Sequence, residues 1–164
     1  MPSARVHRIS ANAPDDFSGL EAAIDAGAID PASIIAIFGK TEGNGLVNDF
    51  SRALAVEALR RLLHGHLADL AVRAVCTVMS GGTEGGMAPH WLVFERRPGD
   101  AEDFPGAALA VGRAHTTELP TEHLGRIDQA RMVAEGVATA MKDAGITNAD
   151  DVHFVQIKCP LLTA

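Results

Sequence analysis

The chain has 164 residues, 47% hydrophobic and 21% charged, which is the composition of a globular protein with a buried core. Its formal net charge of −7 disfavours nucleic acid and anionic membranes as partners, because both bind basic surfaces. No apolar stretch approaches the roughly 20 residues of a membrane span, and the N-terminus lacks the apolar core of a signal peptide. We therefore expect a cytoplasmic protein with no nucleic-acid or membrane partner.

Strand and helix patterns alternate along the chain, which predicts an α/β fold. Short apolar runs predict strands at residues 5–10, 33–39, 72–79, 90–95, 107–115 and 152–158. Helical periodicity predicts helices at residues 17–26, 50–64 and 122–144, of which the first stops at Gly27. Residues 96–106 are charged, contain two prolines and two glycines, and have no periodicity, so they are the best candidate for a linker.

An internal repeat relates residues 22–40 to residues 140–158 at a constant offset of 118. Both segments contain a helix that ends in Asp-Ala-Gly, a short turn, a hydrophobic run and a lysine, Lys40 in the first and Lys158 in the second. The alternative is that any two helix-turn-strand units share glycine stops and aliphatic strands. If the repeat is real, the second copy stops after its lysine, so the sequence predicts one complete and one truncated unit.

The two lysines suggest catalysis by a serine and a lysine. An amine at the end of a buried strand is partly withdrawn from water, which favours its neutral form and lets it act as a base toward a serine hydroxyl. The alternative is a lysine whose head group simply reaches water from a strand end.

Two further features are candidates for ligand binding. The loop at residues 80–88 begins with Ser80 and Gly81 and contains further glycines, so its backbone N–H groups could approach an anion closely. Arg52 lies in the first turn of the helix at 50–64, where a cation opposes the helix dipole, which suggests a binding role. The alternatives are a flexible connection for the loop and a charge balanced by Asp49 for the arginine.

Other chemistries are disfavoured. Gly39-Lys40-Thr41 resembles the end of a phosphate-binding loop, but that motif needs a glycine where this chain has Ile34. No metal-ligand spacing accompanies the histidines. A catalytic Cys159 beside Lys158 is disfavoured, because adjacent residues of a strand point to opposite faces.

Four segments together resemble the cyanuric acid hydrolase and barbiturase family of ring-opening amidohydrolases. They are GKTEGNG at residues 39–45, NDFSR at 48–52, MSGGTEG at 79–85 and VQIKCPLL at 155–162. The resemblance implies three similar α/β units, each a mixed sheet covered by helices, around a pseudo-threefold axis. Residues 1–103 would form the first unit, 104–106 a linker, and 107–164 the N-terminal part of a truncated second unit.

The resemblance also implies roles for individual residues. Lys158 matches the family's catalytic lysine, while Lys40, Arg52, Ser80 and Gly81 would bind the substrate. The nucleophilic serine would follow later in the second unit, outside this sequence. No metal or other cofactor is expected in this chain, since the family's structural metal site belongs to the missing third unit. We expect partners in a small cyclic amide, the remainder of the same polypeptide and, in the intact enzyme, identical subunits, with a tetramer one option.

The implied reaction opens cyanuric acid to carboxybiuret, which loses carbon dioxide to give biuret. An alternative is a barbiturase that acts on barbituric acid, and a second is a non-enzymatic α/β trimer that binds a metabolite. Because the site needs groups from three units, we expect this chain alone to be inactive.

Overall fold

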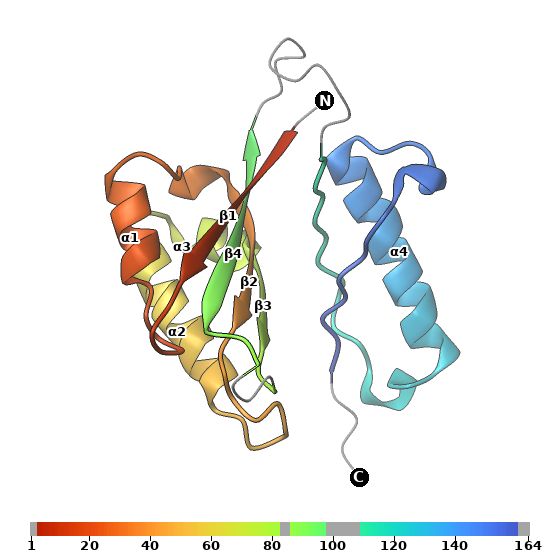
Figure 1. Cartoon of the computed structure of the whole chain (residues 1–164). Coiled ribbons are helices and arrows are strands. Elements are labelled where there is room, and N and C mark those ends of the chain that lie inside the picture. The colour runs from red at the N-terminus through yellow and green to blue at the C-terminus, as the bar shows by residue number, and fades with distance from the viewer. Residues whose placement is uncertain (1–2, 83–85, 98–108, 161–164) are drawn as a thin grey trace. The chain divides into compact units, whose positions relative to one another are not determined.

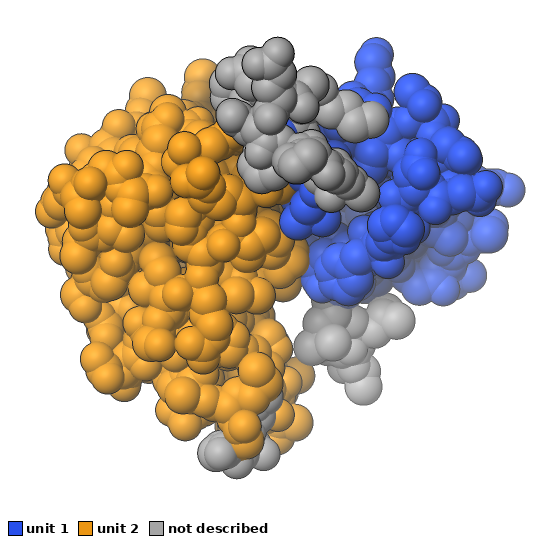
Figure 2. Space-filling view, turned by 45° about the horizontal axis from the view of Figure 1, so that its top comes forward, with its two compact units in different colours: residues 1–3, 98–164 blue, residues 4–97 orange. Residues whose placement is uncertain are grey.

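The structure is a computed structural model that describes residues 3–82, 86–97 and 109–160. The chain separates into two compact units, residues 4–97 and residues 1–3 with 98–164, which Figure 2 shows in different colours. The end of the first repeat unit predicted at 103 and the linker predicted at 104–106 lie outside the described residues. Each unit is described by itself below.

The first unit contains a four-stranded mixed sheet (Figure 1). Its strands are β1 (Ser3–Ser10), β2 (Ile34–Lys40), β3 (Cys76–Ser80) and β4 (His90–Arg97), in the spatial order β1-β4-β2-β3. Strand β2 is central: it runs parallel to β3 and antiparallel to β4. The predicted α/β class with a mixed sheet is thereby confirmed, and the predicted strands at 5–10, 33–39 and 90–95 lie within two residues of the observed ones at each end.

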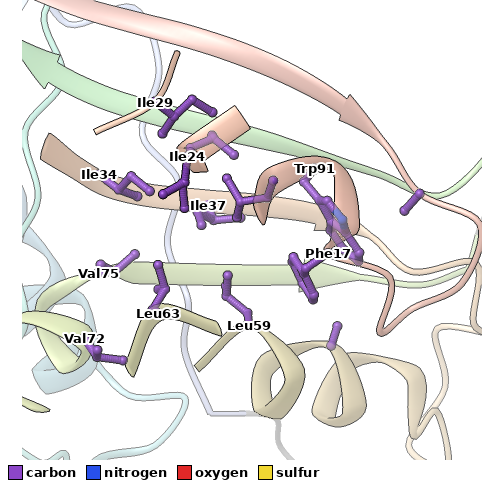
Figure 3. Close-up of a cluster of buried hydrophobic side chains, with 14 residues drawn as sticks. Phe17, Ile24, Ile29, Ile34, Ile37, Leu59, Leu63, Val72, Val75 and Trp91 are labelled. Atoms are coloured by element: carbon purple, nitrogen blue, oxygen red, sulfur yellow. The ribbon is translucent and has the colours of Figure 1, made fainter. Parts of the chain in front are cut away.

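Three helices pack on one face of this sheet and build the core: α1 (Ser18–Asp25), α2 (Ser51–His64) and α3 (Asp69–Ala74). Helical spacing places Ala55, Leu59 and Leu63 on a single side of α2, where all three are buried. Trp91 on β4 is fully buried and stacks on Phe17 at a ring distance of 4.2 Å (Figure 3). The buried hydrophobic cluster consists of residues between Ala11 and Val93, all of which belong to the first unit.

The prediction of one strand across residues 72–79 is wrong in its first half. Residues Asp69–Ala74 form α3, and the strand begins only at Cys76. An ion pair between Arg73 Nε and Asp69 Oδ2, 2.7 Å apart at i and i+4, supports the short helix. The apolar run spans both elements, so periodicity alone did not separate them.

The second unit contains one long helix, α4 (Ile127–Ala144), preceded by the 3-10 turn η2 (Thr121–His123). The strands predicted at 107–115 and 152–158 are wrong, because residues 109–115 and 152–158 have no strand structure. The backbone N–H of Arg113 instead donates to Asp143 Oδ2 of α4 at 2.9 Å. In the first unit, β2 pairs with β3 and β4, and both of these strands follow it in the chain. Lys158 corresponds to the end of β2 at the 118-residue offset, and only six residues of this sequence follow it.

The turns support the internal repeat in detail. Gly27 and Gly145, 118 positions apart, both have positive φ, 69° and 73°, the left-handed conformation in which glycine commonly ends a helix. The N–H groups of Gly27 and Ala28 donate to the carbonyls of Ile24 and Ala23. At the same offset, Gly145 and Ile146 donate to Lys142 and Met141.

The next turn repeats as well. The 3-10 turns η1 (Pro31–Ser33) and η3 (Ala149–Asp151) lie 118 residues apart. Asp30 caps the first through the N–H of Ala32, and Asn148 caps the second through the N–H of Asp150. The two similar sequence segments therefore form the same capped 3-10 turn.

Within the described residues, we find no helix with both the length and the apolar character needed to cross a membrane.

Candidate functional site

Lys40 and Ser80 meet at the carboxyl ends of the two parallel strands. They are register partners, Lys40 as the last residue of β2 and Ser80 as the last residue of β3. Lys40 Nζ donates to Ser80 Oγ at 2.9 Å and to the carbonyl of Gly81 at 3.3 Å. Three of the residues predicted to bind substrate are thus brought together by the sheet itself.

Strand alternation places this pair on the face opposite the helices. A Cβ atom on Gly39 would meet Met79 Sδ and the ring of Trp91, so Gly39 faces the helix-covered core. Lys40, the next residue, points to the other face, as does Phe38, which packs against Phe94 with a ring distance of 4.8 Å. The side chain of Lys40 is therefore half-buried beside Ser80 instead of inside the core.

Glycines let the loop after β2 and the loop after β3 approach closely. The N–H of Gly82 donates to the carbonyl of Gly43. A Cβ atom on Gly45 would come within 2.9 Å of Gly82 Cα, and both residues have positive φ, 73° and 79°. Larger residues at these positions would push the loops apart. Of the loop predicted at 80–88, Ser80 instead ends β3, residues 81–82 and 86–88 have no helix or strand structure, and residues 83–85 lie outside the described residues.

Arg52 lies in the first turn of α2, as predicted. Its Nη2 donates to the carbonyl of Leu46 at 2.5 Å, and its Nε lies 3.5 Å from Asp49 Oδ2. The arginine side chain remains 36% exposed. These contacts hold the guanidinium against the loop while leaving part of it open to a ligand.

Asp49 connects Arg52 to the glycine loops. Its side chain is 1% exposed and accepts hydrogen bonds from the N–H of Gly45 at 2.8 Å and of Ser51 at 3.0 Å. Burial by itself would raise the pKa of this carboxyl group. The hydrogen bonds from Ser51 and Gly45, together with the charge of Arg52, outweigh burial and hold the pKa below its ordinary value.

Thr41 and Ser51 complete a buried hydrogen-bond chain that the sequence analysis did not identify. The N–H of Thr41 donates to the carbonyl of Ser80 at 3.0 Å, and Thr41 Oγ1 lies 2.7 Å from Ser51 Oγ. Ser51 Oγ in turn donates to Asp49 Oδ1. The Asp49-x-Ser51 spacing just before a helix is the local signal that could have identified this pair, since aspartate commonly accepts from the N–H two residues on.

Lys158, the predicted catalytic lysine, lies in the second unit. It occupies the segment 152–160, which has no regular secondary structure, and its side chain is exposed. By the 118-residue offset it corresponds to Lys40, but the counterpart of Ser80 would fall beyond residue 164. Within the described residues, the lysine–serine arrangement is therefore seen in the first unit.

The side chains and loop N–H groups of this candidate site can perform two kinds of chemistry, proton exchange and binding of polar oxygen atoms. A lysine amine at hydrogen-bond distance from a serine hydroxyl can exchange a proton with it or hold it in place. An arginine and exposed loop N–H groups can bind the oxygen atoms of an anionic or polar ring. Among the residues that the structure describes, no group of three or more His, Cys, Asp or Glu side chains is placed to hold a metal ion.

Comparison with known proteins matches this chain to longer enzymes. It is 65% identical over 164 residues to a cyanuric acid amidohydrolase of Azorhizobium caulinodans, covering all of this chain and 46% of the relative. It is 60% identical over 163 residues to a cyanuric acid amidohydrolase of Bradyrhizobium sp. strain ORS 375, covering 98% of this chain and 44% of the relative. The chain therefore spans less than half the length of these relatives.

Solved structures agree. The crystal structure of the cyanuric acid hydrolase from A. caulinodans superimposes with a TM-score of 0.91 at 64% identity, covering 99% of this chain and 45% of that one. A second cyanuric acid hydrolase, described as an evolutionary innovation by structural concatenation, gives a TM-score of 0.86 at 45% identity, over 99% of this chain and 46% of that one. Residues 5–164 also match the family described as amidohydrolase ring-opening protein. The chain belongs to this family of ring-opening amidohydrolases.

Proposed function

We propose that this chain forms part of a cytoplasmic hydrolase that opens the ring of cyanuric acid. The observation that carries the proposal is 65% identity across the whole chain to a cyanuric acid amidohydrolase. The first unit adds a physical argument, because its Lys40–Ser80 pair, its glycine loops and Arg52 are suited to hold a small ring rich in carbonyl and N–H groups.

In the proposed mechanism, Lys158 acts as the base. Its amine takes the proton of a serine hydroxyl that lies outside this sequence, and the serine oxygen forms a bond to a ring carbonyl carbon. Backbone N–H groups at serine-glycine loops stabilise the oxyanion, the C–N bond breaks, and the ring nitrogen takes up the proton. Water then attacks the acyl-serine and releases carboxybiuret, which loses carbon dioxide to give biuret.

The residues of the first unit would bind the substrate and not attack it. In this proposal Lys40 keeps Ser80 and the carbonyl of Gly81 in place, and Arg52 presents its guanidinium to a ring oxygen. The intact enzyme would be a homo-oligomer whose subunits each contain three such units.

A chimaeric enzyme tests the proposal. Residues 1–164 replace the matching part of the A. caulinodans cyanuric acid amidohydrolase, and biuret formation is measured with cyanuric acid as substrate, with barbituric acid in parallel. We expect the chimaera to open cyanuric acid at a rate comparable with the parent and to leave barbituric acid intact. A folded chimaera without activity, or one that prefers barbituric acid, would contradict the proposal.

A further inference from the structure

The carboxylate of Asp49 lies between the loop after β2, the start of α2 and the loop after β3. Its Oδ1 accepts from the N–H and the hydroxyl of Ser51, and its Oδ2 accepts from the N–H of Gly45 and faces Arg52 Nε. These four donors approach from the loop after β2 and from the start of α2. A side chain that is 1% exposed and surrounded by donors is held in one orientation.

The same carboxylate contacts the loop after β3. A Cβ atom on Gly81 would overlap Asp49 Oδ2, and one on Gly43 would overlap Asp49 Oδ1. The backbone of Gly81 therefore lies directly against Asp49. Since Lys40 Nζ donates to the carbonyl of Gly81, Asp49 and Lys40 hold this residue from two sides.

A second connection reaches Ser80 through two hydroxyl groups. Ser51 has one hydroxyl proton, and it is directed to Asp49 because a carboxylate can only accept. The 2.7 Å contact between Thr41 Oγ1 and Ser51 Oγ then uses the proton of Thr41, for which the carbonyl of Ser80, 3.4 Å away, is the more distant acceptor. Thr41 is 1% exposed, and its N–H donates to the carbonyl of Ser80. The orientation of this hydroxyl chain is set by the charge of Asp49.

We propose that Asp49 is the positioning residue of the first-unit site, which sets the place of the Arg52 guanidinium and of the Ser80–Gly81 backbone for substrate binding. The inference rests on the proposed function and deepens it, because Asp49 acts through Arg52 and the loop and does not touch the substrate. Arg52 opposes the dipole of α2, so its place in the first turn is stabilised by Asp49 and not by the helix.

Asp49→Asn in the chimaeric enzyme tests this role with the smallest change of shape. All four groups around the carboxylate are donors, so the amide NH2 of asparagine faces a donor whichever way it is turned. We expect KM for cyanuric acid to rise about tenfold to a hundredfold while kcat changes less than about threefold. The matched control is Asp128→Asn, which also removes an aspartate paired with an arginine at i+3, in α4. It should leave both constants unchanged.

A double variant separates positioning from a general structural role. Asp49 acts partly through Arg52, so the rise in KM of Asp49→Asn with Arg52→Ala should be clearly smaller than the product of the two single rises. Losses that multiply in the double variant, or an unchanged KM in Asp49→Asn, would overturn the inference. If the parent enzyme is active but the unsubstituted chimaera is not, that result contradicts the proposed function, and this inference fails with it.

Ser51→Ala decides the question if Asp49→Asn does not fold. It removes the hydroxyl that links Thr41 to Asp49 but leaves the carboxylate charged. We expect a rise in KM of about threefold that persists when Arg52 is already alanine, because Ser51 reaches Ser80 through Thr41. An unchanged KM in Ser51→Ala would contradict the hydroxyl connection from Asp49 to Ser80.

Discussion

Lys40 and Lys158 occupy the same place in two copies of one sequence pattern, yet the proposal gives them different tasks. Lys40 Nζ is held by Ser80 Oγ and by the carbonyl of Gly81, so its amine is engaged in maintaining the loop. Lys158 is exposed in the described segment, and its serine counterpart would follow beyond this sequence. In this proposal, the task of each lysine depends on which serine its amine contacts.

Substitution of each lysine in the chimaeric enzyme tests this asymmetry. Lys158→Ala should lower kcat by about 10²- to 10⁴-fold, because the serine loses its base. Lys40→Ala should chiefly raise KM, by about tenfold, because Ser80 and Gly81 lose a shared donor. Lys142→Ala, in the last turn of α4, is the control and should change neither constant. Equal losses in kcat for Lys40→Ala and Lys158→Ala would contradict the assigned roles.

Helix α1 shows how an element is attached to the sheet through its first residues. Just before the helix, Asp16 accepts from Ser18 Oγ at 2.6 Å and from the N–H of Asn12 at 2.9 Å. The carbonyl of Asp16 accepts from Trp91 Nε1 at 2.8 Å, and Phe17 stacks on the same indole. The start of α1 is thereby joined to β4 by a hydrogen bond and a ring contact.

The Asp16 carboxylate makes the stability of this element depend on pH. Hydrogen bonds, chiefly that from the Ser18 hydroxyl, lower the pKa of Asp16 from 3.8 to about 2. A folded-state pKa below the unfolded value gives a stabilisation that is present above about pH 4 and is lost as the pH falls toward 2.

We therefore expect Asp16→Asn to be less stable than the wild-type chain at pH 7 and nearly equal to it at pH 2. Urea unfolding followed by the fluorescence of Trp91, the sole tryptophan and fully buried, measures the difference. Asp15→Asn, next in the chain and exposed, changes the net charge equally and should follow the wild type throughout. A gap between Asp16→Asn and wild type that stays constant from pH 7 to pH 2 would rule out this account.

The molecule as a whole consists of two units with different contents. The first has a four-stranded sheet, its own buried cluster and the Lys40–Ser80 pair, whereas the described part of the second has α4 and short turns. The chain spans less than half the length of its relatives, so the proposed three-unit site requires residues from outside this sequence.

At this scale we expect the isolated 164-residue chain not to hydrolyse cyanuric acid. The proposed nucleophilic serine is outside the sequence, and Ser80 Oγ accepts a hydrogen bond from Lys40 Nζ in the proposed binding site. Biuret formation should be undetectable with the chain alone, with its mass verified, and should appear when the complementary part of the A. caulinodans enzyme is supplied. Turnover by the chain alone would instead make Ser80 a nucleophile in a self-assembled site.

Local signals let the sequence determine the α/β class, three strands, the turns that match at an offset of 118 and most of the helices, although the helix predicted from residue 122 begins at Ile127. A glycine with positive φ at 27 or 145 and a capping Asp30 or Asn148 need only their immediate neighbours, so each turn can be predicted from a few residues. The glycine motifs and Arg52 likewise indicated the loops after β2 and β3 as the candidate site.

Only the tertiary structure decided the features that depend on contacts between residues far apart in the sequence. Residues 152–158 have the apolar pattern of β2 but no strand structure, because a strand exists only where a neighbouring strand receives its hydrogen bonds. Asp49 is an ordinary polar loop residue in the sequence. It becomes the buried centre of the site only when Gly81, 32 positions later, folds against it, and a contact of that range leaves no local pattern to predict it from.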